Sequence, residues 1–114
     1  MLEFKGFKEL LNAYKNLPNG MLYSVEKKEN DIKNATFYIV DSDEFKIIEY
    51  VEGDLGEVPE KIYNDKDIIC ELIEIKIFKD IIENKIKQNN DINKNIKVFI
   101  EAFEFYLEYD TFLE

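Results

Sequence analysis

The chain has 114 residues, of which 46% are hydrophobic and 35% are charged. This size fits one domain of the usual ~100–150 residues. Its 25 acidic residues against 15 lysines, with no arginine, give a formal net charge of −10, so a phosphate backbone would be repelled. The absence of histidine removes the commonest general base and transition-metal ligand, which excludes most familiar hydrolytic sites.

The first predicted element is a helix of about four turns. Its apolar residues recur three and four positions apart until a turn at 18–20: Phe4, Phe7, Leu10, Leu11, Tyr14 and Leu17. Residues 21–25 and 35–40 are rich in β-branched and aromatic types, which predicts two strands, with a polar loop over 26–34 between them.

The rest of the chain continues with strands and then helices. Residues 45–51 are a further strand candidate, and 53–59 are rich in turn residues. A nearly continuous apolar run predicts a strand over 67–73. Helical periodicity follows over 75–86, ending in the polar 88–90, and again over 96–107, where Asp91 or Asn93 is an acceptable cap.

This order of elements predicts an α+β fold in a single domain over residues 1–114. We expect an N-terminal helix, a small three- or four-stranded, mainly antiparallel sheet, and two C-terminal helices packed on it.

The cysteine content and the length of the apolar runs indicate where in the cell the protein acts. Cys70 is the only cysteine, so neither an internal disulfide nor a Cys/His zinc site can form, and its apolar neighbours favour a core residue over a nucleophile. No segment approaches the ~20 apolar residues of a membrane helix. We therefore expect a cytoplasmic protein that contacts neither membranes nor nucleic acid.

Known catalytic and ligand-binding motifs do not fit the chain. A calcium loop beginning at Asp41 fails at Phe45 and Lys46, and one beginning at Asn89 fails at Lys94. The glycines are not arranged as a phosphate-binding loop. Paired carboxylates can act as acid and base, but with so many acids some pairs are close by chance. We predict no enzyme, no cofactor and no metal.

The negative charge is concentrated in two segments. Residues 41–60 hold eight acids and one lysine, and residues 101–114 hold five acids and no lysine. The remainder of the chain carries a small positive excess. The sequence therefore predicts two acidic surfaces rather than a uniformly acidic protein.

We expect these acids to face a basic partner. In the last helix, Phe105 and Tyr109 lie almost opposite the apolar stripe, where they would act as exposed anchors. The alternatives are that another element buries both aromatics and that the acids only maintain solubility. The predicted partner-binding residues are Asp41, Asp43, Glu44, Glu52, Asp54, Glu57, Glu101, Glu104, Phe105, Glu108 and Tyr109.

Several segments together resemble a family of small acidic bacterial proteins. The segments are 37–44 (FYIVDSDE), 58–59 (VP), 78–84 (FKDIIEN), 101–103 (EAF) and 110–112 (DTF). Some members look like immunity proteins of contact-dependent inhibition and related polymorphic-toxin systems.

The resemblance implies an immunity protein that neutralises a cognate toxin. The partner would be the C-terminal toxin domain of a large exoprotein, bound as a 1:1 heterodimer with its active site covered. A basic, nuclease-type toxin would match the acidic segments, because complementary charge speeds association. The alternative is an acidic nucleic-acid mimic or regulatory adaptor that binds a basic host protein.

Overall fold

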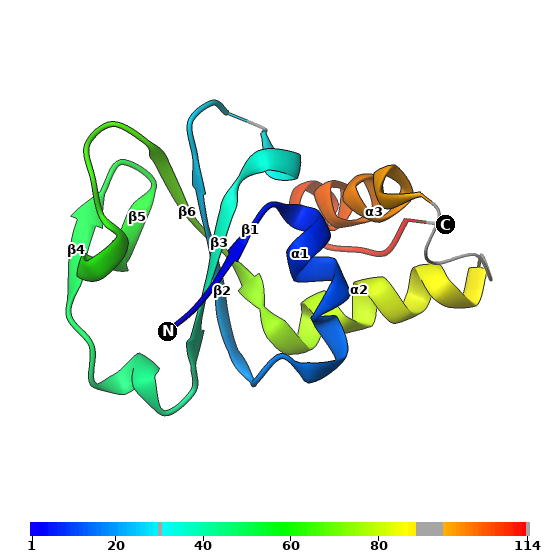
Figure 1. The fold of residues 1–114 in the computed structure, drawn as a ribbon, viewed down its shortest axis with the longest axis horizontal. Helices are drawn as coiled ribbons and strands as arrows, with labels where there is room; N and C mark the ends of the chain where they lie inside the picture. Colours follow the sequence, from blue (N-terminus) through cyan, green and yellow to red (C-terminus); the bar gives the residue numbers. More distant parts are fainter. Residues whose placement is uncertain (30, 89–94, 114) are drawn as a thin grey trace.

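A central sheet with a different cover on each face forms the fold (Figure 1). The computed structural model describes residues 1–29, 31–88 and 95–113. The central sheet is antiparallel throughout, in the order β1-β3-β2-β6. Its strands are β1 (Leu2–Lys5), β2 (Gly20–Glu26), β3 (Thr36–Asp41) and β6 (Ile68–Glu74).

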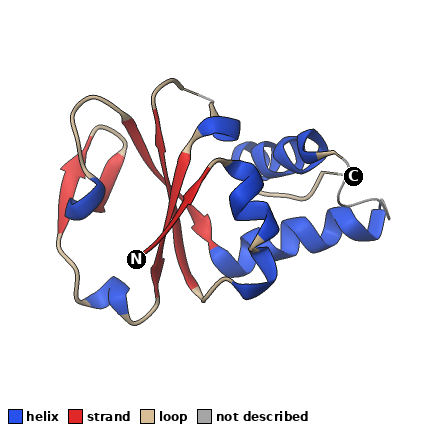
Figure 2. Ribbon diagram, viewed as in Figure 1, coloured by secondary structure: helices blue, strands red, loops and turns tan. Residues whose placement is uncertain are grey.

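Helices cover one face of this sheet and a small hairpin covers the other (Figure 2). The helices are α1 (Phe7–Asn12), α2 (Ile75–Gln88) and α3 (Ile96–Tyr109). The hairpin consists of β4 (Tyr50–Gly53) and β5 (Gly56–Pro59). Short 3-10 turns occupy Tyr14–Asn16, Ile32–Asn34, Glu44–Lys46 and Glu60–Ile62. The protein is therefore α+β, with two C-terminal helices as predicted.

Strand alternation explains how two cores form on one sheet. In β3, Phe37 and Ile39 join the cluster beneath the helices, whereas Val40 joins the cluster beneath the hairpin. In β2, Leu22 and Tyr23 divide in the same way. Successive side chains of a strand point to opposite faces, so strands covered on both sides are apolar at nearly every position.

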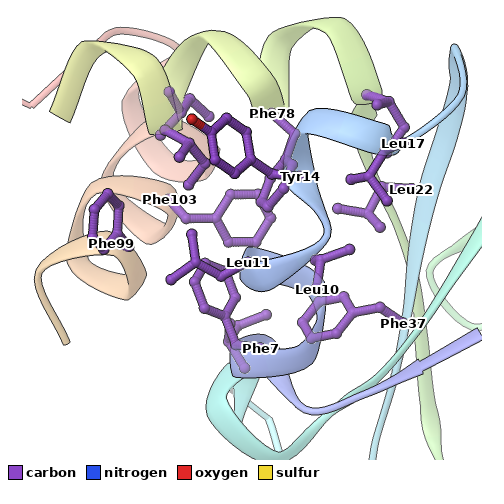
Figure 3. Packing of buried hydrophobic residues seen from close by; sticks show 14 of the residues in the cluster. Phe7, Leu10, Leu11, Tyr14, Leu17, Leu22, Phe37, Phe78, Phe99 and Phe103 are labelled. Carbon is purple, nitrogen blue, oxygen red and sulfur yellow. The ribbon is translucent and has the colours of Figure 1, made fainter. Parts of the chain in front are cut away.

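The helix-side core is built around aromatic rings (Figure 3). The ring centroids of Phe7 and Phe103 lie 5.6 Å apart, and those of Phe78 and Phe103 lie 5.4 Å apart and perpendicular. All three side chains are fully buried. Edge-to-face contacts of this kind stabilise a core beyond the burial of apolar area alone.

The last helix begins and ends with identifiable capping residues. The Asn95 side chain accepts a hydrogen bond from the Lys97 backbone N–H at 3.2 Å, which caps the start of α3. Asp110 ends the helix in the left-handed conformation, with φ of 57°. The two residues expected as caps, Asp91 and Asn93, lie outside the described residues, as do Asn89 and Asn90 at the predicted end of the preceding helix.

The N-terminal prediction was wrong at its beginning. Residues expected to start the helix instead form strand β1, in which Phe4 pairs with Phe37 of β3. Gly6, with φ of 87°, separates the strand from the helix, and this left-handed backbone suits glycine best. Because Phe4 and Phe7 fit either a strand–turn–helix or a continuous helical stripe, spacing alone did not distinguish the two.

The prediction of a strand over 45–51 was also wrong for most of its length. Glu44–Lys46 form a 3-10 turn, and strand structure begins only at Tyr50. The following stretch, predicted as turns, contains β5 and closes the hairpin through Asp54 and Leu55. The apolar residues of 45–51 misled the prediction because Ile47 is 81% exposed and packs in neither core.

Candidate functional site

Residues 42–67 form one layer over the sheet face away from the helices, here called the hairpin layer. The hairpin layer holds nine acids and three lysines, a net charge of −6. Val58 and Ile62 turn inward and pack with Tyr23 and Val40 of the sheet. Most of the acids consequently lie on the outer surface of the layer.

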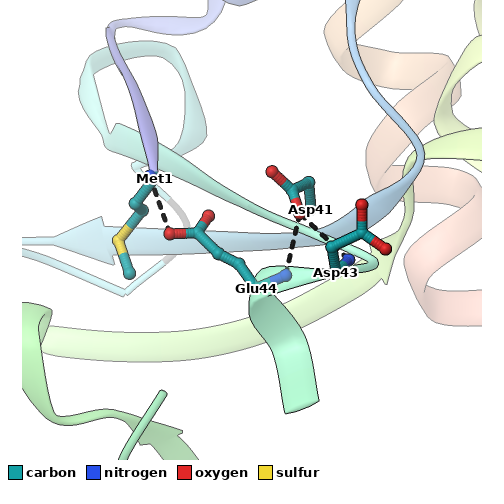
Figure 4. A network of polar contacts seen from close by, with 4 residues as sticks. All are labelled: Met1, Asp41, Asp43 and Glu44. Atoms are coloured by element: carbon teal, nitrogen blue, oxygen red, sulfur yellow. Dashed lines mark hydrogen bonds and ion pairs between the residues drawn. The ribbon is translucent and has the colours of Figure 1, made fainter. Parts of the chain in front are cut away.

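Two of the predicted partner-binding acids serve the structure itself (Figure 4). Asp41 Oδ1 accepts hydrogen bonds from the backbone N–H groups of Asp43 at 3.0 Å and Glu44 at 2.9 Å, which fixes the turn after β3. The Met1 amine donates to Glu44 Oε2 at 2.9 Å. Asp43 is exposed, so of these three it is the one best placed to meet a partner.

The hairpin carries three more of the predicted acids on its outer surface. Glu52 and Glu57 pair directly across the two strands, and Asp54 stands at the tip. All three are exposed. Like charges directly opposite each other on neighbouring strands destabilise the pairing. The hairpin therefore maintains an arrangement that costs stability in the free protein.

No lysine in the described part of the chain neutralises these carboxylates. Within the described part of the chain, the ion pair between Met1 and Glu44 is the only one with nitrogen and oxygen closer than 4.0 Å. Glu52, Asp54 and Glu57 therefore have no cationic partner among the described residues. Their charge is available to a cation that arrives from outside.

Strand β6 adds an acid that the sequence did not single out. Glu71 pairs with Tyr23 of β2, and residues paired in this way share a face of the sheet. The Tyr23 hydroxyl donates to Glu71 Oε2 at 3.3 Å. Burial, the charge of Glu71 and more distantly that of Glu57 raise the pKa of Tyr23. Glu71 lies two positions after Ile69, which packs in the hairpin-side core, so the two share a face; the nearly continuous apolar run of 68–73 gave no signal of this in the sequence.

Exposed apolar side chains accompany the acids. Four large hydrophobic residues of the hairpin layer are exposed to between 39% and 81%: Phe45, Ile47, Leu55 and Tyr63. Apolar and aromatic contacts mixed with charge are typical of a protein–protein interface. The surface fits a partner that is basic and also offers apolar pockets.

The second predicted surface, on α3, is separate. Phe99 and Phe103 of α3 pack in the helix-side core, so the helix lies across the sheet from the hairpin layer. The eleven predicted residues therefore do not form one continuous surface, because the connection from β3 to β6 crosses one face of the sheet and α3 packs on the other.

The α3 surface is also less uniform in charge. Glu101 and Glu108 are exposed, whereas Glu104 is partly buried, and burial together with the charge of Glu101 raises its pKa. A shallow cleft beside Glu101 and Glu104 is also lined by Lys33 and Lys97, so both signs of charge meet there.

The two predicted aromatic anchors differ in exposure. Tyr109 is 58% exposed, and Phe105 is partly buried with its ring centroid 4.6 Å from that of Tyr109. Neither residue belongs to the helix-side core. The pair forms a small aromatic patch on α3, rather than two independent anchors.

Three further findings on the described residues concern metal binding, thiol reactivity and membrane insertion. No group of three or more Cys, Asp or Glu side chains among residues 1–29, 31–88 and 95–113 is arranged to hold a metal ion. Cys70 is half-buried, and burial raises the pKa of its thiol, which disfavours the reactive thiolate. None of the described helices is both long and apolar enough to span a membrane.

Comparison with known proteins gives one match. A family described as a domain of unknown function (DUF7716) matches residues 5–114, nearly the whole chain. No curated protein and no solved structure matches.

Proposed function

Because the chain belongs to the DUF7716 family, which carries no assigned activity, we propose its function from its surface: it is a binding protein that covers a basic site on another protein. The observation that carries this proposal is the unpaired acidic surface of the hairpin layer. Its outer carboxylates have no lysine partners in the described chain, and exposed apolar side chains lie among them.

The cost of this arrangement supports a binding role over a purely solubilising one. Solubility requires net charge but not a particular arrangement of it. The Glu52–Glu57 pair lowers the stability of the free protein. Ile47, which is 81% exposed, lowers its solubility. A partner with cationic and apolar groups would offset both costs.

The partner we propose is a basic, nuclease-type toxin domain at the C-terminus of a large exoprotein, bound 1:1 in the cytoplasm. The resemblance of segments 37–44 and 78–84 to immunity-type proteins favours this class. A nuclease active site is basic because it binds phosphates, so carboxylates placed where phosphates would lie can block it. The protein would act by occupation alone and would not be an enzyme.

Co-expression with the adjacent reading frame tests the proposal. We expect a tagged chain to capture the adjacent toxin domain in a 1:1 complex and to restore growth of cells that express it. A toxin domain from an unrelated system serves as the control and should be neither captured nor neutralised. Growth arrest that persists despite full expression of the chain would contradict the immunity role.

The second candidate is an acidic mimic of nucleic acid or a regulatory adaptor that binds a basic host protein. The same unpaired hairpin-layer carboxylates support it. It predicts capture of a nucleic-acid-binding host protein in cells that lack the neighbouring toxin gene, with DNA or RNA competing for that complex. Capture of the adjacent toxin domain alone would favour the immunity role.

A further inference from the structure

One edge of the central sheet is open. Strand β1 stands at the end of the sheet, and within the described chain it pairs only with β3 (Figure 1). Three of its four residues are exposed: Leu2, Glu3 and Lys5. Leu2 is 45% exposed although it is apolar. An edge strand of this kind presents unpaired backbone N–H and C=O groups, on which a further strand can add.

Strand β1 is held in place at several points. The Met1 amine just before it donates to Glu44 Oε2 at 2.9 Å, and the Tyr38 hydroxyl of β3 donates to Glu3 Oε1 at 2.8 Å. Phe4 packs against the helix-side core. The edge is therefore already extended in the free protein, which lowers the entropic cost of adding a strand to it.

The ladder to β3 determines which backbone groups of β1 face the open edge. The Gly6 N–H donates to the Ala35 carbonyl at 2.8 Å, and β1 keeps this register along its length. Hydrogen-bonded pairs alternate along an antiparallel ladder, so the backbone groups of Phe4 also face β3. The N–H and C=O groups of Glu3 and Lys5 consequently face away from the sheet.

A second copy of β1 can satisfy these groups in one favourable register. Antiparallel addition places outward-facing residues opposite each other, so Glu3 can meet Glu3 or Lys5 of the copy, or Lys5 can meet Lys5. Identical residues opposite each other bring like charges together, which is unfavourable. The remaining register pairs Glu3 with Lys5 on both sides of the two-fold axis. It also places the two Phe4 residues opposite each other at the centre.

The charges of β1 favour pairing over protection of the edge. Charged side chains often keep edge strands apart, and charges of one sign would repel a copy in every register. Strand β1 instead carries one charge of each sign, and neither Glu3 nor Lys5 has an ion-pair partner among the described residues. In the matched register Leu2 stands opposite Gly6 of the copy, whose missing side chain leaves room for it.

We propose that β1 is a dimerisation edge, on which a second copy of the chain adds antiparallel with Glu3 opposite Lys5. The two four-stranded sheets then form one closed, two-fold symmetric sheet. Opposite residues share a face, so both hairpin layers lie on the same side of it. The inference is independent of the proposed function, because β1 lies outside the hairpin layer. With about four backbone hydrogen bonds, the interface is small and the dimer reversible.

Sedimentation equilibrium of the untagged chain over a concentration series tests the dimer. We expect the mass to rise from 13.6 kDa toward twice that value. Amide hydrogen exchange followed by NMR locates the interface. The amides of Glu3 and Lys5 should become protected as the dimer forms, whereas that of Phe4 is protected throughout. A mass that stays monomeric at millimolar concentration, or protection gained on another element, would overturn the proposal.

Charge variants test the register. Glu3→Lys places lysines opposite each other and Lys5→Glu places glutamates, so each should weaken self-association about tenfold. An equimolar mixture of the two variants should form a heterodimer, because every lysine then faces a glutamate. The double variant Glu3→Lys with Lys5→Glu keeps the net charge and should dimerise like wild type. The matched control Glu108→Lys, on the exposed surface of α3, should not weaken the dimer.

The heterodimer also controls for folding, because a single variant that lost its fold could not form it. Self-association of either single variant as strong as that of wild type would overturn the register and the proposal with it. If the chain stays monomeric and its Glu3 and Lys5 amides become protected only when the toxin domain is added, the edge belongs to a strand of that partner instead. Capture of the toxin domain requires no dimer, so it tests the proposed function separately.

Discussion

The hairpin layer and the outer surface of α3 are both acidic, yet they differ in what supports the acids. The hairpin layer covers a modest core, and its charged residues face outward without lysine partners in the described chain. Helix α3 belongs to the larger, aromatic core, and its acids share their surroundings with Lys33 and Lys97. The two surfaces thus carry the same sign of charge in different structural surroundings.

This difference shows that the net charge of a sequence segment does not give the charge of the surface that a partner would contact. Glu71 belongs to a segment with an ordinary charge balance, but it joins the hairpin side of the sheet. Glu104 belongs to an acidic segment, but it is partly buried. We expect the helix side to determine stability and the hairpin side to determine binding, and the following predictions test that division.

Phe103→Ala is expected to have the largest effect on stability. The fully buried ring contacts Phe7 and Phe78, and its loss should lower the free energy of unfolding by about 3–5 kcal/mol. The matched change on the hairpin side, Val58→Ala, should cost about 2 kcal/mol because it removes two methyl groups from a smaller core. Urea unfolding measures both, and equal losses would contradict the division.

Charge reversal should affect binding mainly on the hairpin side. Asp54→Lys with Glu57→Lys removes the attraction of the tip, and we expect roughly 10- to 100-fold slower association with the toxin domain at low salt. The salt dependence of the rate should flatten as well. Stopped-flow association measures both quantities.

The matched pair on α3 is Glu101→Lys with Glu108→Lys, which makes the same change in net charge. It should alter the association rate by less than about threefold, because steering depends on charges near the docking surface. A similar slowing by both pairs would show that net charge alone attracts the partner, and that the hairpin layer has no special role.

Glu26→Gln is expected to stabilise the free protein at neutral pH. Burial, together with the charges of Asp31 and Glu104, raises the pKa of Glu26 despite hydrogen bonds from the Ser24 hydroxyl and the Asp31 backbone. The stability that a carboxyl with a raised pKa contributes is fully present below its unfolded pKa, near 4, and is lost as pH rises through the folded value. Glutamine does not titrate, so the variant avoids this loss.

The pH dependence of that difference is the sharper measurement. Unfolding in urea should show Glu26→Gln more stable than wild type by about 1 kcal/mol at pH 7, with the gap closing toward pH 4. The exposed Glu108→Gln should show a gap of only a few tenths of a kcal/mol at either pH. A variant that is less stable than wild type at pH 7 would show that the carboxylate is satisfied in the free protein.

Glu52→Lys should give the smallest effect. It replaces a like-charge pair across β4 and β5 with an opposite-charge pair, so we expect a gain of roughly 0.5 kcal/mol measured by thermal unfolding. Glu108→Lys, on the exposed surface of α3, should change stability less. If Glu52→Lys instead lowers the melting temperature, the two glutamates are not in conflict, and the proposed cost of the hairpin acids is absent.

The regular elements were predictable from the sequence where periodicity was unambiguous. The strands at 20–26, 36–41 and 68–74 and the two C-terminal helices agree with the sequence analysis. The strands are short runs rich in β-branched, aromatic and other apolar residues, whereas the helices keep one apolar period. Strand β1 was not predictable, since Leu2–Lys5 is short and its pairing with β3 depends on residues far along the chain.

The candidate site was predictable in composition but not in arrangement. The acids of 41–60 were identified, and the hairpin presents Glu52, Asp54 and Glu57 outward. The burial of Glu26 was not predictable, because it results from packing against distant segments and has no local signal in the sequence. The separation of the hairpin layer from α3 likewise has no local signal, because it depends on which face of the central sheet the chain crosses after β3 and after β6.

One further consequence comes from the continuity of the hairpin layer. Residues 42–67 leave the sheet after β3 and return at β6 as a single uninterrupted insertion, whereas the helix layer draws on both ends of the chain. Within the layer, inward residues such as Val58 and Ile62 must fit the sheet, but the outward residues are free of that constraint. Selection can therefore replace the exterior of this insertion as a unit, and relatives can diverge in partner preference while keeping the same register of the central strands.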